Sequence, residues 1–221
     1  IMGDMTLLEF ARGPGMQWAI WIFCFGVLWR IVGSMYLLGT KDLSRARQTH
    51  YVRDGMRAVL TRSAPAEAFE KKIRFQHITG YLWHLALFIS VLFFAPHILF
   101  FESILGFSWP HLPNTIILVS AAVAAAVLLA LFIRRATHPV QRLISTADDY
   151  ISMVLVLLPI VTGLAAFAHV GARYETLFAI HLLSVELMLI WYPFSKLMHA
   201  FMTFPARYQS GTFFGHRGVK A

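Results

Sequence analysis

The chain has 221 residues, of which 58% are hydrophobic and only 14% charged, with a mean hydropathy of +0.64. This balance is far from that of an average soluble domain and predicts a protein surrounded mainly by lipid. The net charge of +8 lies between long apolar runs, which is not the pattern of a nucleic-acid binder. With Cys24 as its only cysteine, the chain cannot build an intramolecular disulfide or a thiolate metal site alone.

Five stretches are apolar enough to cross a hydrocarbon core about 30 Å thick, which takes about 20 helical residues. We therefore predict an all-α membrane protein, a single domain over 1–221 that folds as a bundle of five transmembrane helices over 17–38, 77–101, 114–133, 150–170 and 176–201. Arg12 precedes the first run and no small-residue cleavage pattern ends it. We therefore expect this helix not to be a removable signal peptide.

The distribution of basic residues predicts how the chain is oriented in the membrane. The links over 39–76 and 134–147 carry nine and three Lys or Arg, whereas those over 102–113 and 171–175 carry none and one. Because cytoplasmic loops are enriched in Lys and Arg, we predict an N-terminus outside and a C-terminus in the cytoplasm. The predicted location is the inner (cytoplasmic) membrane, crossed several times.

Three local patterns outside the spans predict further structure. The cytoplasmic loop has room for a short amphipathic helix at 52–60. Asp148 and Asp149, directly after Thr146, are expected to cap the fourth span. The aromatic and basic tail over 205–221 is typical of a protein interface and is predicted to be an ordered arm that binds a partner.

Four histidines fall inside predicted spans, where ionisable side chains are costly and are functional candidates by default. His84 and His97 lie in the second span, about 20 Å apart along an ideal helix, and His181 and His199 lie in the fifth, about 27 Å apart on one face. Because the two spans run antiparallel, His84 is expected to meet His199 near the inner surface and His97 to meet His181 near the outer one. Two levels of paired imidazoles predict two b-type haems.

Several details of this arrangement leave alternatives open. Thirteen residues turn an ideal helix through about 1300°, which puts His84 and His97 on different faces unless Pro96 breaks the helix and re-aims His97. His77, one heptad before His84, is an alternative ligand or an interfacial residue. Arg30 either reaches the cytoplasmic surface or pairs with a propionate of the inner haem. The four histidines themselves have a competing interpretation as interhelical hydrogen-bonding groups.

Several motifs, in order along nearly all spans, carry a family resemblance. They are Phe23-Cys-Phe-Gly-Val-Leu-Trp-Arg30, Gly80-Tyr-Leu-Trp-His84, Ser145-Thr-Ala-Asp-Asp149, and His181 followed by Tyr192-Pro-Phe-Ser-Lys-Leu-Met-His199. With them the chain resembles the gamma subunit of respiratory nitrate reductase and its relatives, the membrane cytochromes of sulfite reductase-associated and heterodisulfide reductase-like complexes. It departs from the nitrate reductase pattern at the second ligand of the second span, where the usual spacing lands on Phe94 and the nearest histidine is His97.

The resemblance implies a five-helix cytochrome with two haems b, ligated from the second and fifth spans. Such a subunit oxidises quinol near the outer face and passes electrons to an iron-sulfur protein and a catalytic subunit on the cytoplasmic side. It would be the electron-transfer subunit of a larger oxidoreductase. The alternative is a haem-free membrane anchor or a proton-relay or transport subunit, which an inverted repeat with broken spans would favour; the sequence shows no such repeat.

Overall fold

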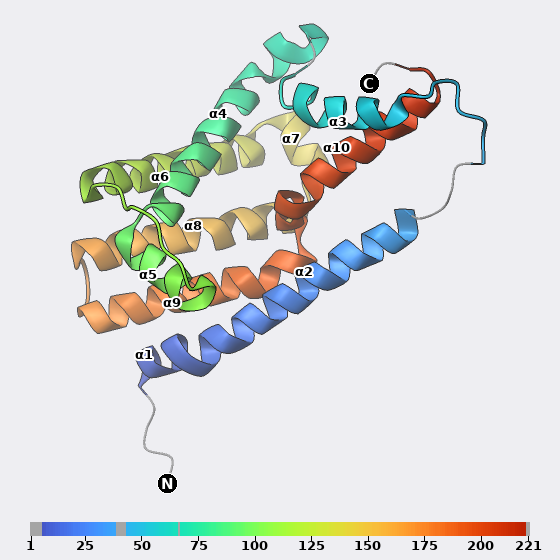
Figure 1. The fold of residues 1–221 in the computed structure, drawn as a ribbon. Coiled ribbons are helices and arrows are strands. Elements are labelled where there is room, and N and C mark those ends of the chain that lie inside the picture. Colours follow the sequence, from blue (N-terminus) through green and yellow to red (C-terminus); the bar gives the residue numbers. More distant parts are fainter. Residues whose placement is uncertain (1–5, 39–42, 66, 220–221) are drawn as a thin grey trace. The chain divides into compact units, whose positions relative to one another are not determined.

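The computed structural model describes residues 6–38, 43–65 and 67–219, and all regular secondary structure in these ranges is helical (Figure 1). Five helical segments are long and apolar enough to cross a membrane: Leu7–Leu37, Ala68–Leu92, Asn114–Thr137, Ala147–Ala168 and Tyr174–Phe194. The prediction of an all-α protein with five candidate spans is confirmed. The orientation of the termini stays a prediction.

The chain forms two compact units, each built from segments far apart in sequence. The first unit is Ile1–Ile20 with Phe75–Ile190, and the second is Trp21–Arg74 with Trp191–Ala221. Three helices contribute residues to both units: α2 (Met16–Leu38), α4 (Glu67–Leu92) and α9 (Tyr174–Trp191), of which only Trp191 belongs to the second.

The first unit holds most of the candidate spans. Besides its parts of α2 and α4, its elements are α1 (Leu7–Phe10), η1 (Ala11–Gly15), α5 (Ala95–Leu105), α6 (Asn114–Thr137), α7 (Pro139–Ile144), α8 (Ala147–Ala168) and α9 (Tyr174–Trp191). Helices α6 and α8 pack against each other, and their buried residues include small ones, Ser120 and Ala124 on α6 and Ser152 on α8. Small residues let helix backbones approach closely in lipid, where no hydrophobic force drives helices together.

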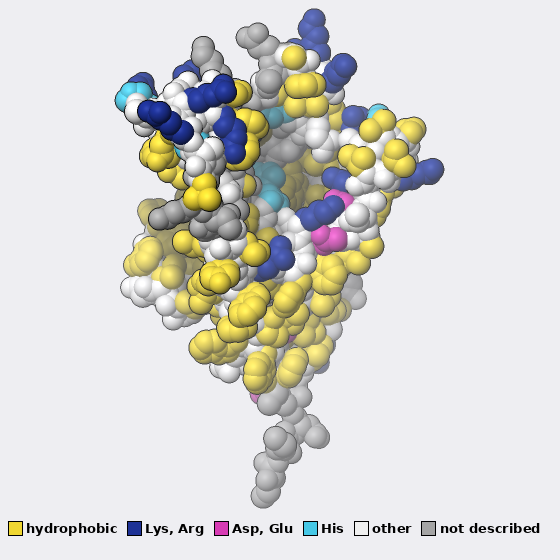
Figure 2. Space-filling view, turned by 90° about the vertical axis from the view of Figure 1, so that its right-hand side faces the viewer, with side chains coloured by type: hydrophobic (Ala, Val, Ile, Leu, Met, Phe, Trp, Pro, Cys, Tyr) yellow, Lys and Arg dark blue, Asp and Glu magenta, His cyan; other side chains and the backbone are white. Residues whose placement is uncertain are grey.

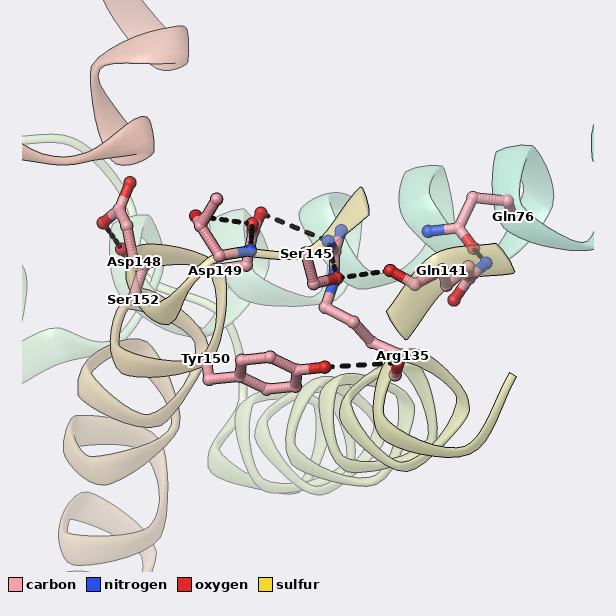
Figure 3. Close-up of polar contacts among 9 residues, drawn as sticks. Gln76, Arg135, Gln141, Ser145, Asp148, Asp149, Tyr150 and Ser152 are labelled. Atoms are coloured by element: carbon pink, nitrogen blue, oxygen red, sulfur yellow. Dashed lines mark hydrogen bonds and ion pairs between the residues drawn. The ribbon is translucent and has the colours of Figure 1, made fainter. Parts of the chain in front are cut away.

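A polar network fixes the start of α8 (Figure 3). The hydroxyl of Thr146 and the carboxylate of Asp149 form a capping box, in which the Thr146 backbone N–H donates to Asp149 Oδ2 at 2.8 Å. Arg135 of α6 forms an ion pair with the same carboxylate at 3.2 Å. The expectation of an acidic cap on the fourth span is confirmed for Asp149, whose carboxylate accepts from a backbone N–H, whereas Asp148 accepts from the Ser152 hydroxyl at 2.9 Å.

The second unit contains the amphipathic loop helix and the C-terminal helix. Besides its parts of α2 and α4, its elements are α3 (Tyr51–Thr61), η2 (Tyr192–Phe194), η3 (Lys196–Met198) and α10 (His199–His216). Figure 1 shows α3 alongside α10. A Cβ added at Gly211 would lie 2.5 Å from Cβ of Ala58, and one added at Gly215 would lie 2.5 Å from Oδ2 of Asp54. The two helices therefore touch at their backbones, a contact that larger side chains at these glycines would prevent.

The loop helix and the tail match their predicted local structure. Helix α3 covers the amphipathic segment predicted at 52–60, and both Arg53 and Arg57 are exposed. The tail predicted as an ordered arm over 205–221 is helical as far as His216 and packs on α3. Residues 220 and 221 lie outside the described residues, and the binding of a partner to this arm stays a prediction.

The fifth predicted span, 176–201, differs from the structure in its last third. Helix α9 ends at Trp191, and a fully buried Pro193 follows within η2. A proline lacks the backbone N–H and crowds the preceding turn, so it ends a helix. Its ring packs where Gly26 of α2 has no side chain, since a Cβ there would lie 2.6 Å from Pro193 Cγ.

The turn after this proline changes the expected placement of His199. Ser195 adopts an extended backbone (φ −117°, ψ 178°), and its hydroxyl oxygen accepts from the Leu197 N–H at 3.2 Å. His199 then begins α10. His181 and His199 therefore do not share one continuous helix, and the spacing of an ideal helix does not apply to them.

Large apolar side chains are exposed along the candidate spans, as expected of helices that face lipid. On α2, Trp18, Trp21 and Trp29 are each about 70% exposed, at 69%, 71% and 69%. Figure 2 shows hydrophobic side chains covering much of the face that it draws.

Gly211→Ala is expected to lower the thermal midpoint of unfolding in detergent, because the new methyl would meet Ala58 and overpacking costs about 1–3 kcal/mol. Gly33→Ala on α2 is the matched control, since nothing lies within 4 Å of its added Cβ and alanine favours a helix by about 1 kcal/mol. Circular dichroism melting of both purified variants measures the difference. Equal midpoints would contradict the close α3–α10 contact.

Candidate functional site

The first unit brings two of the predicted ligand histidines together. His97 of α5 and His181 of α9 have ring centroids 6.2 Å apart and ring planes inclined by 15°. With a metal–imidazole bond of about 2 Å, two imidazoles on opposite sides of one metal ion have ring centroids about 6 Å apart. The observed separation therefore fits a pair of imidazoles that share one metal.

Both rings form their hydrogen bonds through Nδ1. Nδ1 of His97 donates to the Val91 carbonyl at 3.1 Å, and Nδ1 of His181 lies 3.3 Å from the Thr162 hydroxyl. That hydroxyl directs its own proton to the Leu158 carbonyl at 2.7 Å, so it accepts from His181. A neutral imidazole protonated at Nδ1 presents the lone pair of Nε2, which is the form that binds metals. The partner at Nδ1 also orients the ring, as it does in known metal sites.

The position of His97 depends on a break between α4 and α5. The second span was predicted as one helix over 77–101, but α4 ends at Leu92 and α5 begins at Ala95. Pro96 has no backbone N–H, so the carbonyl of Leu92, four residues earlier, cannot be paired within a helix. The break predicted at this proline is present, and it begins at Phe94, whose backbone is extended.

Three donors bind the carbonyl groups that the break leaves unpaired. The indole N–H of Trp109 donates to the Leu92 carbonyl at 2.6 Å, and the backbone N–H of Leu112 donates to the Phe93 carbonyl at 3.0 Å. The third donor is Nδ1 of His97, which binds the Val91 carbonyl. Unpaired carbonyls within a membrane are costly, so these bonds stabilise the break. Because His97 supplies one of them, its ring is oriented by the end of α4.

Small and apolar groups complete the surroundings of the two rings. A Cβ at Gly163 of α8 would lie 3.1 Å from Cε1 of His181, so this glycine lets α8 approach the imidazole. The ring of Phe94 stands edge-on to His97, with centroids 5.1 Å apart. Ser184 donates to the backbone carbonyl of His181 at 2.6 Å and lies 3.0 Å from the Thr162 hydroxyl.

The other two candidate ligands lie in different units. His84 belongs to the first unit and is half-buried, and its Nδ1 donates to the Gly80 carbonyl at 2.7 Å. His199 belongs to the second unit and is exposed, and its Nδ1 donates to the Lys196 carbonyl at 2.8 Å. Each ring thus donates through Nδ1 to a backbone carbonyl, as the ring of His97 does. The pairing of His84 with His199 stays a prediction.

Two further candidates from the sequence, His77 and Arg30, lie on α4 and α2. His77 is half-buried on α4, with its ring 4.8 Å from that of Tyr81. Arg30 is exposed on α2, inside a candidate span, and forms no ion pair with a described residue. Among the described residues, no three or more His, Cys, Asp or Glu side chains cluster around a point where they could hold a metal ion. Ligation of haem iron differs, because it needs only two imidazoles from the protein.

Sequence reasoning missed the groups that position the histidines. Trp109 lies in a predicted loop and Thr162 in the middle of an apolar run, and neither carries a local signal that points to its partner. Glu186 does carry a signal, because it is an acidic residue inside the fifth predicted span.

Comparison with known proteins identifies one relative. No family model matches the chain. A protein of Nitratidesulfovibrio vulgaris is 28% identical over 211 residues, which cover 93% of this chain and 92% of that protein. The similarity therefore runs along nearly the whole of both chains. That protein is described simply as "Protein", so the similarity carries no function across.

Trp109→Phe is expected to lower the free energy of unfolding by about 0.5–1.5 kcal/mol, because the Leu92 carbonyl loses the donor that it has at the end of α4. Trp83→Phe is the matched control, since the Trp83 indole N–H is buried and has no partner among the described residues. Thermal unfolding of both variants measures the difference. A loss no larger for Trp109→Phe than for Trp83→Phe would show that the bond does not stabilise the break.

Proposed function

We propose that this chain is a di-haem b cytochrome subunit that anchors a respiratory complex in the inner membrane and carries electrons between the quinone pool and an iron-sulfur or catalytic partner. The observation that carries the proposal is the His97–His181 pair, with centroids 6.2 Å apart and both Nδ1 atoms in hydrogen bonds. This pair forms the proposed outer site. His84 and His199 form the proposed inner site.

The residues of the outer site suit a haem in three respects. His97 and His181 would hold the iron through their Nε2 atoms, and imidazole is a common protein ligand of haem iron. The partners of Nδ1 fix each ring and raise its basicity as a ligand. Gly163 lets the backbone of α8 approach the His181 ring, beside the Thr162 hydroxyl that contacts Nδ1. When bound, haem supplies the one-electron redox chemistry.

The inner site rests on two further groups besides its histidines. Arg30 places a cation inside a span, where a counter-charge is needed, and a haem propionate would supply one. His77, seven residues before His84 on α4, remains the alternative ligand on that helix.

The proposed orientation follows the basic residues. With the N-terminus outside, the exposed arginines of α3 and the C-terminal helix α10 lie on the cytoplasmic side. An iron-sulfur protein or a catalytic subunit would bind there, and quinol would be oxidised near the outer haem.

His97→Ala and His181→Ala are each expected to lower the haem content from about two to about one per chain, because each removes an axial ligand of the same site. His199→Ala is expected to remove the other haem and to leave the outer one. The pyridine haemochrome assay measures haem per chain, and the double variant H181A/H199A is expected to hold none.

His111→Ala is the control for these variants. His111 is exposed and follows α5, and its loss is expected to leave both haems in place. Addition of a quinol to the purified protein is expected to reduce the haems. Two haems retained in His181→Ala would overturn the assignment of the outer site.

A further inference from the structure

Glu186 is a buried carboxyl group that the proposed electron transfer does not use. It lies on α9 inside the candidate span Tyr174–Phe194 and is only 6% exposed. Its Oε1 atom is covered and has no hydrogen-bond partner among the described residues. An ionisable side chain in such a place is unusual enough to be treated as a functional group.

The carboxyl group packs against the η1 turn, within the same unit. A Cβ added at Gly15 would lie 2.7 Å from Oε2 and 3.1 Å from Oε1 of Glu186, so the glycine makes room for the carboxyl group. The turn is irregular, because Gly13 has non-helical dihedrals (φ −104°, ψ −106°) and Pro14 follows it. Irregular backbone at membrane depth is usual where it is covered by protein or lines a binding cavity.

The charged groups on α1 and η1 are used elsewhere. The guanidinium of Arg12 lies over the Phe178 ring, 5.0 Å from its centroid. The carboxylate of Glu9 accepts from the Thr6 backbone N–H and hydroxyl at 2.8 and 2.9 Å. Glu186 therefore has no counter-charge among the described residues. An isolated carboxylate in an apolar setting is strongly disfavoured, so we expect Glu186 to be the neutral acid.

A neutral carboxylic acid has one O–H donor, and here that donor needs an acceptor. Glu186 lies about 18 Å along the span from Tyr174 and about 12 Å from Phe194, near the middle of the span. Lipid ester and headgroup oxygens stay at the interface, so they do not reach this depth. A molecule that enters the hydrocarbon core and carries a carbonyl oxygen would supply such an acceptor.

We propose that Glu186 and the η1 turn form a binding site for a quinone, in which the carboxylic acid donates a hydrogen bond to a quinone carbonyl oxygen. Several kinds of membrane-soluble compound carry a carbonyl group, and the choice of a quinone among them rests on the proposed function. Glu186 is five residues after His181, which places it about 7.5 Å further along α9 and about 140° around it. The quinone therefore binds on the η1 side of α9, and the His97–His181 pair lies on another side.

Direct binding of short-chain benzoquinone and naphthoquinone analogues to the purified full-length protein tests this site, with tryptophan fluorescence quenching as the readout. Glu186→Leu is expected to weaken binding about tenfold, the loss of one hydrogen bond to a buried group. Glu186→Gln keeps a donor and is expected to bind within a few-fold of the wild type. Glu175→Leu is the control on the same helix, because Glu175 is exposed and paired with Arg173 at 3.1 Å.

Gly15→Ala provides a second variant that keeps the carboxyl group but displaces it, and it is expected to weaken binding as Glu186→Leu does. Infrared spectroscopy of the ligand-free protein is expected to show a protonated carboxylic acid band that Glu186→Gln removes. Unchanged quinone affinity in both Glu186→Leu and Gly15→Ala would overturn the proposed site, even in a protein that contains two haems. Binding that depends on Glu186 in a protein without haem would retain the site and refute the proposed function.

Discussion

Inside a membrane a backbone carbonyl needs a donor from the protein itself, and this constraint determines where His97 lies. Pro96 removes a donor from the second span, and the end of α4 is left with carbonyl groups to pair. The indole of Trp109 and the imidazole of His97 supply two of the missing donors. His97 is thus oriented by a backbone requirement, and its ring then lies 6.2 Å from that of His181.

A second proline produces a similar break in the other unit. Pro193 ends α9, its ring fills the space left by Gly26, and Ser195 caps the next short helix. The Tyr-Pro-Phe-Ser-Lys motif before His199 therefore has a structural explanation, because these residues end one helix and start another. In both units a candidate ligand histidine follows a proline break, and its Nδ1 donates to an earlier backbone carbonyl, six residues back for His97 and three for His199.

The sequence was sufficient to predict features that depend on local pattern. Hydropathy located five spans, the Thr146–Asp149 spacing predicted a helix cap, and Pro96 predicted a break next to His97. It was not sufficient where a feature depends on a distant segment. Trp109 is 17 residues from the carbonyl that it binds, and only the folded chain brings them together. The assumption of one straight helix through Pro193 failed because the proline's role in ending α9 was not considered.

The central claim is that imidazole pairs in this bundle bind haem, and the visible spectrum of the purified wild-type protein tests it most directly. Protein produced with an adequate haem supply should show, in the reduced-minus-oxidised spectrum, the sharp alpha band of a bis-histidine b-type cytochrome. A protein that is folded in detergent but has no haem absorption would contradict the account.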